Sequence, residues 1–313
     1  MGGWVSAVAV IMRNAYREAV RARILHGLFA LAMATTAYAI VVGEYASKDA
    51  SRVLSDLGAA SISVYGVAVA IIMGATSLYR ELELKTLFPI LARPLHRAQY
   101  LVGKYLGTLL TLLVFMLINS AVLLWCVGIM EGVRSWTAPL LLAGGVGAVG
   151  VLAWRVAAVR VEFSAVALLA ALALGYWVAR EAPYARQVVL VSVALSFLEV
   201  ALVAAFATFF SAFSSPFLTA VFTLAVFVVG RSADTLANLP VKVFGQWVHD
   251  AGTLLSKVFP NLMVYVPARS VLVGEAVEVS VGSYLLWAGL QSLGWCTLLL
   301  VGASWIFRRR DFV

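Results

Sequence analysis

The sequence predicts an all-α fold: a polytopic bundle of transmembrane helices forming a single membrane domain over residues 1–313. Hydrophobic residues make up 63% of the chain, charged residues only 12%, and the mean hydropathy is +0.98. Soluble domains are about half apolar and about a quarter charged. Several apolar runs also reach the ~20 residues that a helix needs to cross a hydrocarbon core of ~30 Å. So little charge cannot cover a soluble domain of this size, and we expect an integral membrane protein.

The distribution of charge argues against a nucleic-acid partner, although the formal net charge is +8. The basic residues flank apolar runs, as in cytoplasmic loops, and do not gather with aromatic residues on one face. Cys126 and Cys296 each lie inside an apolar run, where we expect small buried side chains. The three histidines are scattered, and no nucleotide-binding or catalytic motif is present. We therefore predict no catalytic, cofactor-binding or metal-ligating residue in this chain.

The first predicted element is an amphipathic elbow helix within residues 1–23. Apolar residues recur on one face from Trp4 onward, and Arg13, Arg17 and Arg21 recur every four residues on another. Such a helix can bury its apolar stripe in the headgroup boundary while its arginines meet anionic lipid. It can equally be a plain positively charged anchor for the first span, and the two readings are compatible.

Apolar runs then predict six core spans, an extra hairpin and a long loop. The hairpin, within residues 131–186, pairs two short apolar runs, 139–154 and 163–179; the alternative is a re-entrant hairpin that adds no crossing. Residues 44–58 form a charged link, and residues 231–282, broken by prolines, form an external amphipathic loop that includes a helical piece at 247–259. The six expected core spans are 24–43, 59–78, 100–130, 187–213, 217–230 and 284–307.

The Lys and Arg distribution orients these spans. More than half of the 23 basic residues fall on one side when the N-terminus is placed in the cytoplasm, and they concentrate in the short loops. Short cytoplasmic loops are enriched in Lys and Arg. We therefore expect both termini to be cytoplasmic. The membrane we expect is the cytoplasmic membrane of a prokaryote.

The most highly charged stretch, residues 79–99, separates two of the apolar runs. From Tyr79 to Ala92 apolar residues recur near helical spacing, which predicts a short amphipathic helix. Pro94 cannot continue a helix and disfavours helical conformation at Arg93, so a break belongs there. A second helix should begin near Arg97 and enter the membrane. A helix on the membrane face between two spans can be pushed by something outside the membrane.

Two polar residues lie inside apolar runs. Glu199 lies in the middle of one, where a carboxylate costs about 2.5–3.5 kcal/mol on insertion scales. It contacts a substrate or proton in a central cavity, or it is a structural carboxylate bonded to a Ser, to a Thr or to the backbone of a neighbouring chain. Asn119 can contact a neighbouring helix by an interhelical hydrogen bond.

The charged stretch resembles the membrane subunits of type-2, export-class ABC transporters. The resemblance rests on Glu81, Thr86-Leu87, Leu91-Ala92-Arg93-Pro94, Arg97 and Gly103-Lys104. Weaker echoes cover most of the chain: Arg17-Glu18 with Arg21, Phe210 to Pro216, Gly230-Arg231, Phe259 to Leu262, and Phe307 to Asp311. The hairpin at 139–179 departs from the six-span core of that family.

The resemblance implies that two such subunits, alike or different, pair in the lipid membrane with two separate ABC ATPase subunits. Those partners would bind ATP and Mg and hydrolyse the ATP, so this chain would be no enzyme and would bind no cofactor. Its charged stretch would be the coupling helix, or its charges would only enforce topology. The residues implied in coupling are Arg80, Glu81, Glu83, Lys85, Thr86, Leu87, Leu91, Arg93, Pro94 and Arg97.

Two other functions remain open at this stage. A membrane anchor or assembly factor that tethers an ATPase would use the same charged stretch. A secondary carrier driven by an ion gradient would need several intramembrane ionisable groups and usually internal repeats. The sequence offers one such carboxylate, Glu199, and no clear repeat. The transported substrate and its direction are not encoded in any motif.

Overall fold

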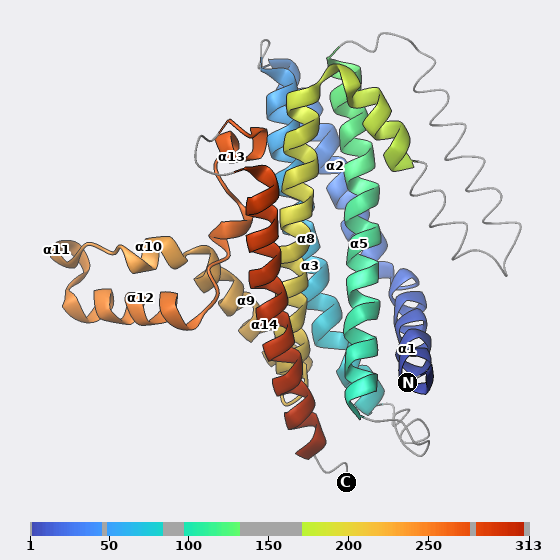
Figure 1. Ribbon diagram of the computed structural model, residues 1–313, viewed down its shortest axis with the longest axis vertical. Helices are drawn as coiled ribbons and strands as arrows, with labels where there is room; N and C mark the ends of the chain where they lie inside the picture. The colour runs from blue at the N-terminus through green and yellow to red at the C-terminus, as the bar shows by residue number, and fades with distance from the viewer. Residues whose placement is uncertain (1, 46–48, 84–96, 132–170, 276–279, 310–313) are drawn as a thin grey trace, which may run out of the picture.

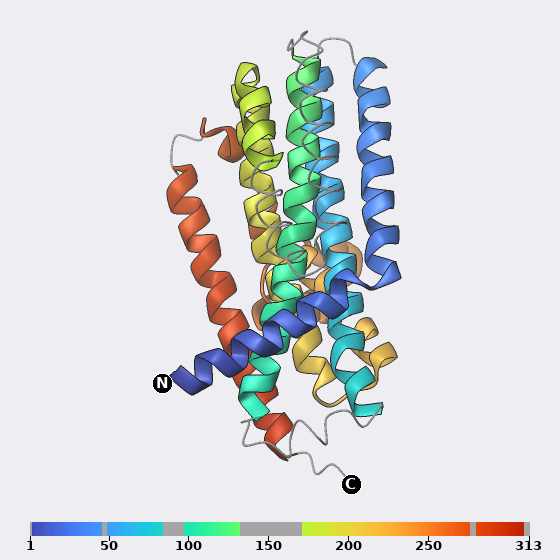
Figure 2. The same cartoon turned by 90° about the vertical axis from the view of Figure 1, so that its right-hand side faces the viewer.

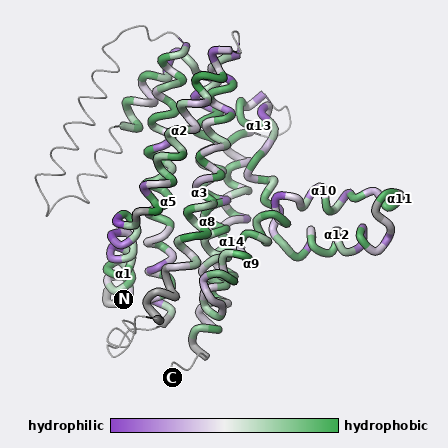
Figure 3. The backbone as a smooth tube through the Cα atoms, turned by 180° about the vertical axis from the view of Figure 1, so that it is seen from behind, coloured by the Kyte–Doolittle hydropathy of each residue, from purple (hydrophilic) through white to green (hydrophobic). Residues whose placement is uncertain are grey.

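A computed structural model describes residues 2–45, 49–83, 97–131, 171–275 and 280–309. Within these ranges the chain is all-α, with eleven α-helices, two short 3-10 helices and no strand. Long helices run side by side along one axis (Figure 1), and hydrophobic residues cover most of their length (Figure 3). The predicted fold class, a multi-span helical membrane protein, is therefore supported.

Five helices are long and apolar enough to cross a membrane. They are α2 (Arg23–Tyr45), α3 (Ala50–Glu83), α5 (Arg97–Met130), α8 (Pro183–Ser211) and α14 (Val281–Arg309). α8 is the most enclosed of them and packs against α3, α5 and α14, whereas α2 and α14 lie at the periphery. Figure 2 shows this order across the bundle. The core is therefore built around α8.

The expected sixth core span is a helix, but it is short. α9 (Pro216–Arg231) has 16 residues, fewer than the ~20 that a hydrocarbon core requires. Ser215 caps its N-terminus by accepting a hydrogen bond from the Leu218 N–H, and Pro216 starts the helix. The described residues thus support five spans, and the six-span core of the prediction is not reached.

The charged link expected at residues 44–58 is also shorter in the structure. α3 begins at Ala50, so most of the link is helical and belongs to the second span. Its charges are accommodated on this helix, because Asp56 forms an ion pair with Arg269 from another part of the chain. The charged residues therefore do not mark where the second span begins, and the prediction of a link that extends to residue 58 was wrong.

The expected elbow helix is present as α1 (Gly2–Val20), which crosses α5 obliquely (Figure 2). Its apolar face packs on α5: Val8, Ala15 and Ala19 are buried, while Arg13 and Arg17 are exposed. Part of the stripe that we expected in the headgroup region is therefore covered by α5. Both chain ends lie toward the same end of the bundle, together with α1 (Figure 1). Their cytoplasmic orientation stays a prediction.

Between α9 and α14 the chain forms a lateral arm and then runs along the side of the bundle. The arm comprises α10 (Ala233–Ala237), α11 (Val241–Phe244) and α12 (Gln246–Val258), and it projects sideways from the bundle (Figure 1). After the arm, η2 (Met263–Tyr265) and α13 (Arg269–Val273) pack against α8. The helical piece predicted at 247–259 is confirmed as α12. The external position of residues 231–282 stays a prediction.

Only the end of the predicted extra hairpin is described. Residues 171–178 are helical and lead through η1 (Ala179–Glu181) into α8. This helix lies close to α5, since a Cβ on Gly128 would come within 2.6 Å of the Val178 carbonyl oxygen. The first apolar run of the hairpin, 139–154, lies outside the described residues. The choice between two spans and a re-entrant hairpin therefore stays open.

Candidate functional site

A cavity of about 530 Å³ opens between α3, α8, the end of α9 and the segment that carries η2 and α13. Small-molecule sites typically have volumes of about 300–1,000 Å³. Its wall mixes apolar residues with hydroxyl and charged groups, which is unusual inside a bundle this hydrophobic. The polar residues that line it are Asp56, Ser63, Ser192, Ser196, Arg231 and Arg269.

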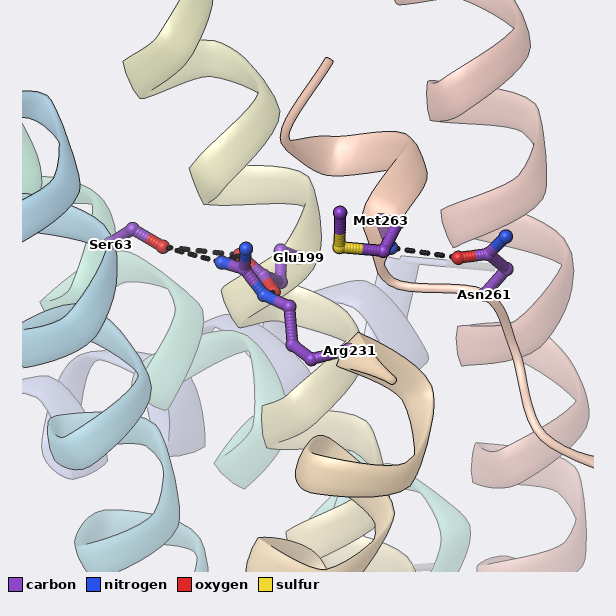
Figure 4. A network of polar contacts seen from close by, with 5 residues as sticks. All are labelled: Ser63, Glu199, Arg231, Asn261 and Met263. Atoms are coloured by element: carbon purple, nitrogen blue, oxygen red, sulfur yellow. Dashed lines mark hydrogen bonds and ion pairs between the residues drawn. The ribbon is translucent and has the colours of Figure 1, made fainter. Parts of the chain in front are cut away.

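The innermost polar group is an ion pair between α8 and α9 (Figure 4). Arg231 donates from Nε to Glu199 Oε1 over 2.6 Å and from a terminal nitrogen to Oε2 over 2.8 Å, a bidentate arrangement. Ser63 of α3 donates to Glu199 Oε2 over 3.1 Å and accepts from Arg231 over 3.3 Å. Three helices are thus joined through one carboxylate.

Burial makes this pair energetically important. Glu199 is fully buried, whereas the Arg231 side chain is 24% exposed and reaches the cavity. An isolated buried charge is costly, but a paired and hydrogen-bonded one is tolerated. Arg231 also lies over the Phe227 ring, with its guanidinium carbon 5.6 Å from the ring centroid. The guanidinium therefore neutralises Glu199 while still facing the cavity.

The short length of α9 positions Arg231 at this depth. Glu199 lies 16 residues into α8, which is ~24 Å from its start at 1.5 Å per residue. α9 returns along α8 and ends at Arg231, level with Glu199. The chain can leave here because Gly230 lets residues 260–262 pack closely: a Cβ on it would lie 2.7 Å from Leu262 Cγ.

Further hydrogen bonds fix the same level of the bundle. Leu262 N–H donates to the Gly230 carbonyl over 3.0 Å, and Asn261 bridges the Asp234 carboxylate and the Met263 N–H (Figure 4 shows the Met263 contact). Next to Glu199 on α8, the Leu198 carbonyl accepts from Ser292 of α14 over 2.9 Å. The Ala201 carbonyl accepts from Tyr105 of α5 over 3.1 Å. Such interhelical bonds hold membrane helices in register.

A second ion pair lies toward the outer part of the cavity. Arg269 of α13 pairs with Asp56 of α3, and both side chains are partly exposed. Arg231, Arg269 and Asp56 line the cavity, and the fully buried Glu199 balances the charge of Arg231 from behind the wall. Among the described residues no group of three or more His, Cys, Asp or Glu could hold a metal ion. The charged and hydroxyl groups of the wall are suited to binding a polar or zwitterionic group.

Sequence reasoning identified Glu199 but missed its partner. Arg231 had been assigned to an external loop, since it follows an apolar run and starts a less hydrophobic segment. The structure favours the structural alternative for Glu199, a carboxylate bonded to a serine, here Ser63, and adds a cation to it. One signal in the sequence could have revealed this partner. The apolar run before Arg231 is too short to cross the membrane, so Arg231 should lie within the membrane and not beyond it.

Asn119, the other predicted intramembrane polar residue, does not join this site. It is buried, and its side-chain nitrogen donates to the Phe115 carbonyl one turn earlier in α5 over 2.7 Å. Its side-chain oxygen has no hydrogen-bond partner among the residues that the structure describes. The interhelical hydrogen bond expected from Asn119 is therefore absent in the described structure.

Most of the predicted coupling residues lie outside the described ranges. Lys85, Thr86, Leu87, Leu91, Arg93 and Pro94 belong to this group. Arg80, Glu81 and Glu83 fall in the last turn of α3, so this part of the expected helix continues α3. Arg97 is the first residue of α5, as predicted. The coupling role of all ten stays a prediction.

Residues quoted for the family resemblance meet in space at two places. Gly103 of α5 lies against α1, because a Cβ on it would be 2.7 Å from Ile11 Cβ. The next residue, Lys104, forms an ion pair with Glu18 of α1 over 3.3 Å. The second place is the contact of Gly230 with Leu262 beside the cavity. These motifs are far apart in sequence, and each of the two contacts joins a pair of them in the folded chain.

The fold defines the chain as a multi-span α-helical membrane protein with a polar cavity inside its bundle. Neither a protein-family model nor a curated protein matches the sequence. The function is therefore argued from the geometry and from the resemblance at the charged stretch.

Proposed function

We propose that the chain is the transmembrane subunit of an ATP-driven transporter of the export-class ABC type. Two such subunits, identical or different, would pair in the membrane with two separate ABC ATPase subunits. ATP and Mg would be bound and hydrolysed by those partners. This chain would supply the path for a substrate and receive the mechanical work.

The observation that carries the proposal is the continuity of α3. The charged stretch at 79–99 starts within this helix, and 16 residues before its first residue the same helix presents Ser63 to the Glu199–Arg231 pair. That separation corresponds to ~24 Å of helix at 1.5 Å per residue. A force applied at the charged stretch would therefore reach the cavity wall through one uninterrupted rod.

The other side of the charged stretch supports the same mechanism. α5 begins at Arg97 and has 34 residues, as α3 does, so both are longer than a membrane span requires. α1 lies across the start of α5 and is attached there by the Lys104–Glu18 ion pair. A displacement of the stretch would consequently move α3, α5 and α1 together.

The cavity favours transport over a simple tether. A tether needs only a docking segment, whereas this bundle also has a cavity of about 530 Å³ with serine and arginine side chains on its wall. α3, α8 and α9 all contribute to that wall, so relative movement of α3 would change its shape. An ion-driven carrier is less well supported, because Glu199 is already neutralised by Arg231.

The proposal is tested by purifying the tagged chain from its native membrane and asking whether an ABC ATPase subunit co-purifies. We expect association for the wild type and its loss for Glu81→Arg and for Leu87→Asp. Glu44→Arg is the matched control, because Glu44 is an exposed carboxylate near the opposite end of the bundle. All variants should keep the wild-type elution volume and thermal stability. Association that survives both changes would refute the docking assignment.

A further inference from the structure

The lateral arm formed by α10, α11 and α12 projects sideways from the bundle at a level between the ends of α8 and α14 (Figures 1 and 3). At this level an element that leaves a transmembrane bundle meets lipid or another membrane subunit. The arm contacts the rest of the described chain mainly through α9. Most of its surface is therefore available to whatever surrounds the bundle.

α12 turns large apolar side chains away from the rest of the chain. Its inner side, toward α10, carries small and polar residues: Gly252 abuts the Leu236 carbonyl, and His249 Nδ1 lies 2.8 Å from the Leu239 carbonyl oxygen. Trp247 is 82% exposed and Leu254 63% exposed, and the charged Asp250 and Lys257 are exposed on the same helix. Exposed apolar side chains beside exposed charged ones are typical of a helix that lies in the membrane interface.

Where α12 returns to the bundle, it borders an apolar groove of about 700 Å³. α8 and α9 form its floor, and Trp295 of α14 and the end of α12 form its sides. The rings are packed together: Phe210 and Phe222 have centroids 5.6 Å apart, and Phe206 and Trp295 6.3 Å. No charged side chain lines the groove. It is open enough for an elongated apolar ligand and offers nothing to a polar one.

α9 separates this groove from the polar cavity. Phe227 and Arg231 of α9 face the cavity, whereas Phe222 and Val226 face the groove. The groove also lies toward the bundle end that carries α1 and the C-terminus, because its α8 residues are near the end of that helix. It is thus a distinct site in the leaflet on the α1 side.

We propose that this groove binds one acyl chain of a membrane phospholipid, with α12 lying in the membrane beside it. The occupant is set by the surroundings: the groove opens between two candidate spans, where hydrocarbon chains are the abundant apolar ligand. The outward apolar face of α12 fits the same environment. A second copy of the chain covering the groove is the competing occupant, and the test separates the two.

The experiment is native mass spectrometry of the full-length chain, purified in detergent, delipidated and titrated with palmitoyl-oleoyl-phosphatidylcholine. We expect one tightly held lipid per chain. Ala225→Trp should lower its affinity at least tenfold, because Ala225 is exposed and lines the groove, so that an indole would fill it. Leu224→Trp is the matched control, since Leu224 is exposed on the same helix but does not line the groove. Leu255→Glu, at the α12 side, should weaken binding as Ala225→Trp does.

Each alternative outcome overturns the proposal. Lipid binding that is equal in Ala225→Trp and wild type would show that the lipid sits elsewhere. A wild-type chain that holds no lipid, or a dimer that Ala225→Trp converts to monomers, would show that the groove is empty or covered by a second copy. None of these readouts depends on an ATPase partner, so this inference and the proposed function fail separately.

Discussion

At the scale of single residues, the central feature is the pairing of Glu199 with Arg231. The carboxylate is fully buried, and it accepts two hydrogen bonds from the guanidinium and one from Ser63. Removing one member of a buried pair leaves an uncompensated charge and costs about 3–5 kcal/mol. Replacing both members by apolar residues of similar volume is often close to neutral. The pair therefore predicts a strongly non-additive pattern of stability.

We predict that Arg231→Met destabilises the chain by about 3 kcal/mol or more, because it strands a buried carboxylate. Glu199→Leu should cost less, since the Arg231 side chain is partly exposed and can turn toward the cavity. The double variant should recover most of the loss. The measurement is thermal unfolding in detergent, arranged as a double-mutant cycle. Additive effects of the two single changes would contradict the pairing.

Sequence reasoning recognises one half of such a pair more easily than the other. Glu199 is visible because it interrupts an apolar run, whereas Arg231 follows a run and resembles an ordinary flanking charge. Which arginine pairs with the buried carboxylate depends on the position of the end of α9 in the folded bundle, and the sequence alone does not give that position. An interhelical bond of Asn119 is hard to predict for a related reason: a buried amide can bond within its own helix, as the Asn119 side-chain nitrogen does with the Phe115 carbonyl.

At the scale of helices, contact between α1 and α5 depends on two glycines. A Cβ on Gly107 would lie 2.5 Å from Ala15 Cβ and 2.8 Å from the Met12 carbonyl oxygen. Backbone cannot yield as a flexible side chain can, so even a methyl group must push the two helices apart. This close approach also brings Lys104 to Glu18. Small residues at helix interfaces commonly allow such packing in membranes.

We predict that Gly107→Ala destabilises the chain by about 1–3 kcal/mol, the usual cost of overpacking. Gly289→Ala is the matched control, because a Cβ there meets nothing within 4 Å, and it should be neutral or slightly stabilising. Thermal unfolding in detergent provides the comparison. Equal stability of the two variants would mean that α1 does not pack on α5 as described.

Long apolar runs predicted most of the helices because length and hydropathy suffice for them. α2, α5, α8 and α14 lie close to their predicted ranges. The errors arose where a contact between distant residues stabilises a helix that the local sequence does not favour. α3 begins among charged residues, and one of them, Asp56, is paired with Arg269. A central cavity was one alternative for Glu199, but the residues of its wall were not predicted, since they come from α3, α8, α9 and residues 265–272 and no single segment contains them.

At the scale of the whole molecule, the bundle connects one charged stretch to one open cavity lined by polar and charged residues. The last residues of α3 are the first residues of that stretch, and the same helix contributes Ser63 to the hydrogen-bond network around Glu199. The lateral arm leaves the bundle at the level of this network, because α9 ends at Arg231. A movement of α3 would therefore reach the cavity and the root of the arm together.

The central claim is that residues 79–99 contact a separate ATPase subunit. It is tested most directly by placing the photo-crosslinking amino acid p-benzoylphenylalanine at Leu87 and irradiating intact cells. The account predicts a crosslink to a protein that carries an ATP-binding motif, and no such crosslink from Tyr45, an exposed residue toward the opposite end of the bundle. Absence of an ATPase crosslink from Leu87, or an equal one from Tyr45, would contradict it.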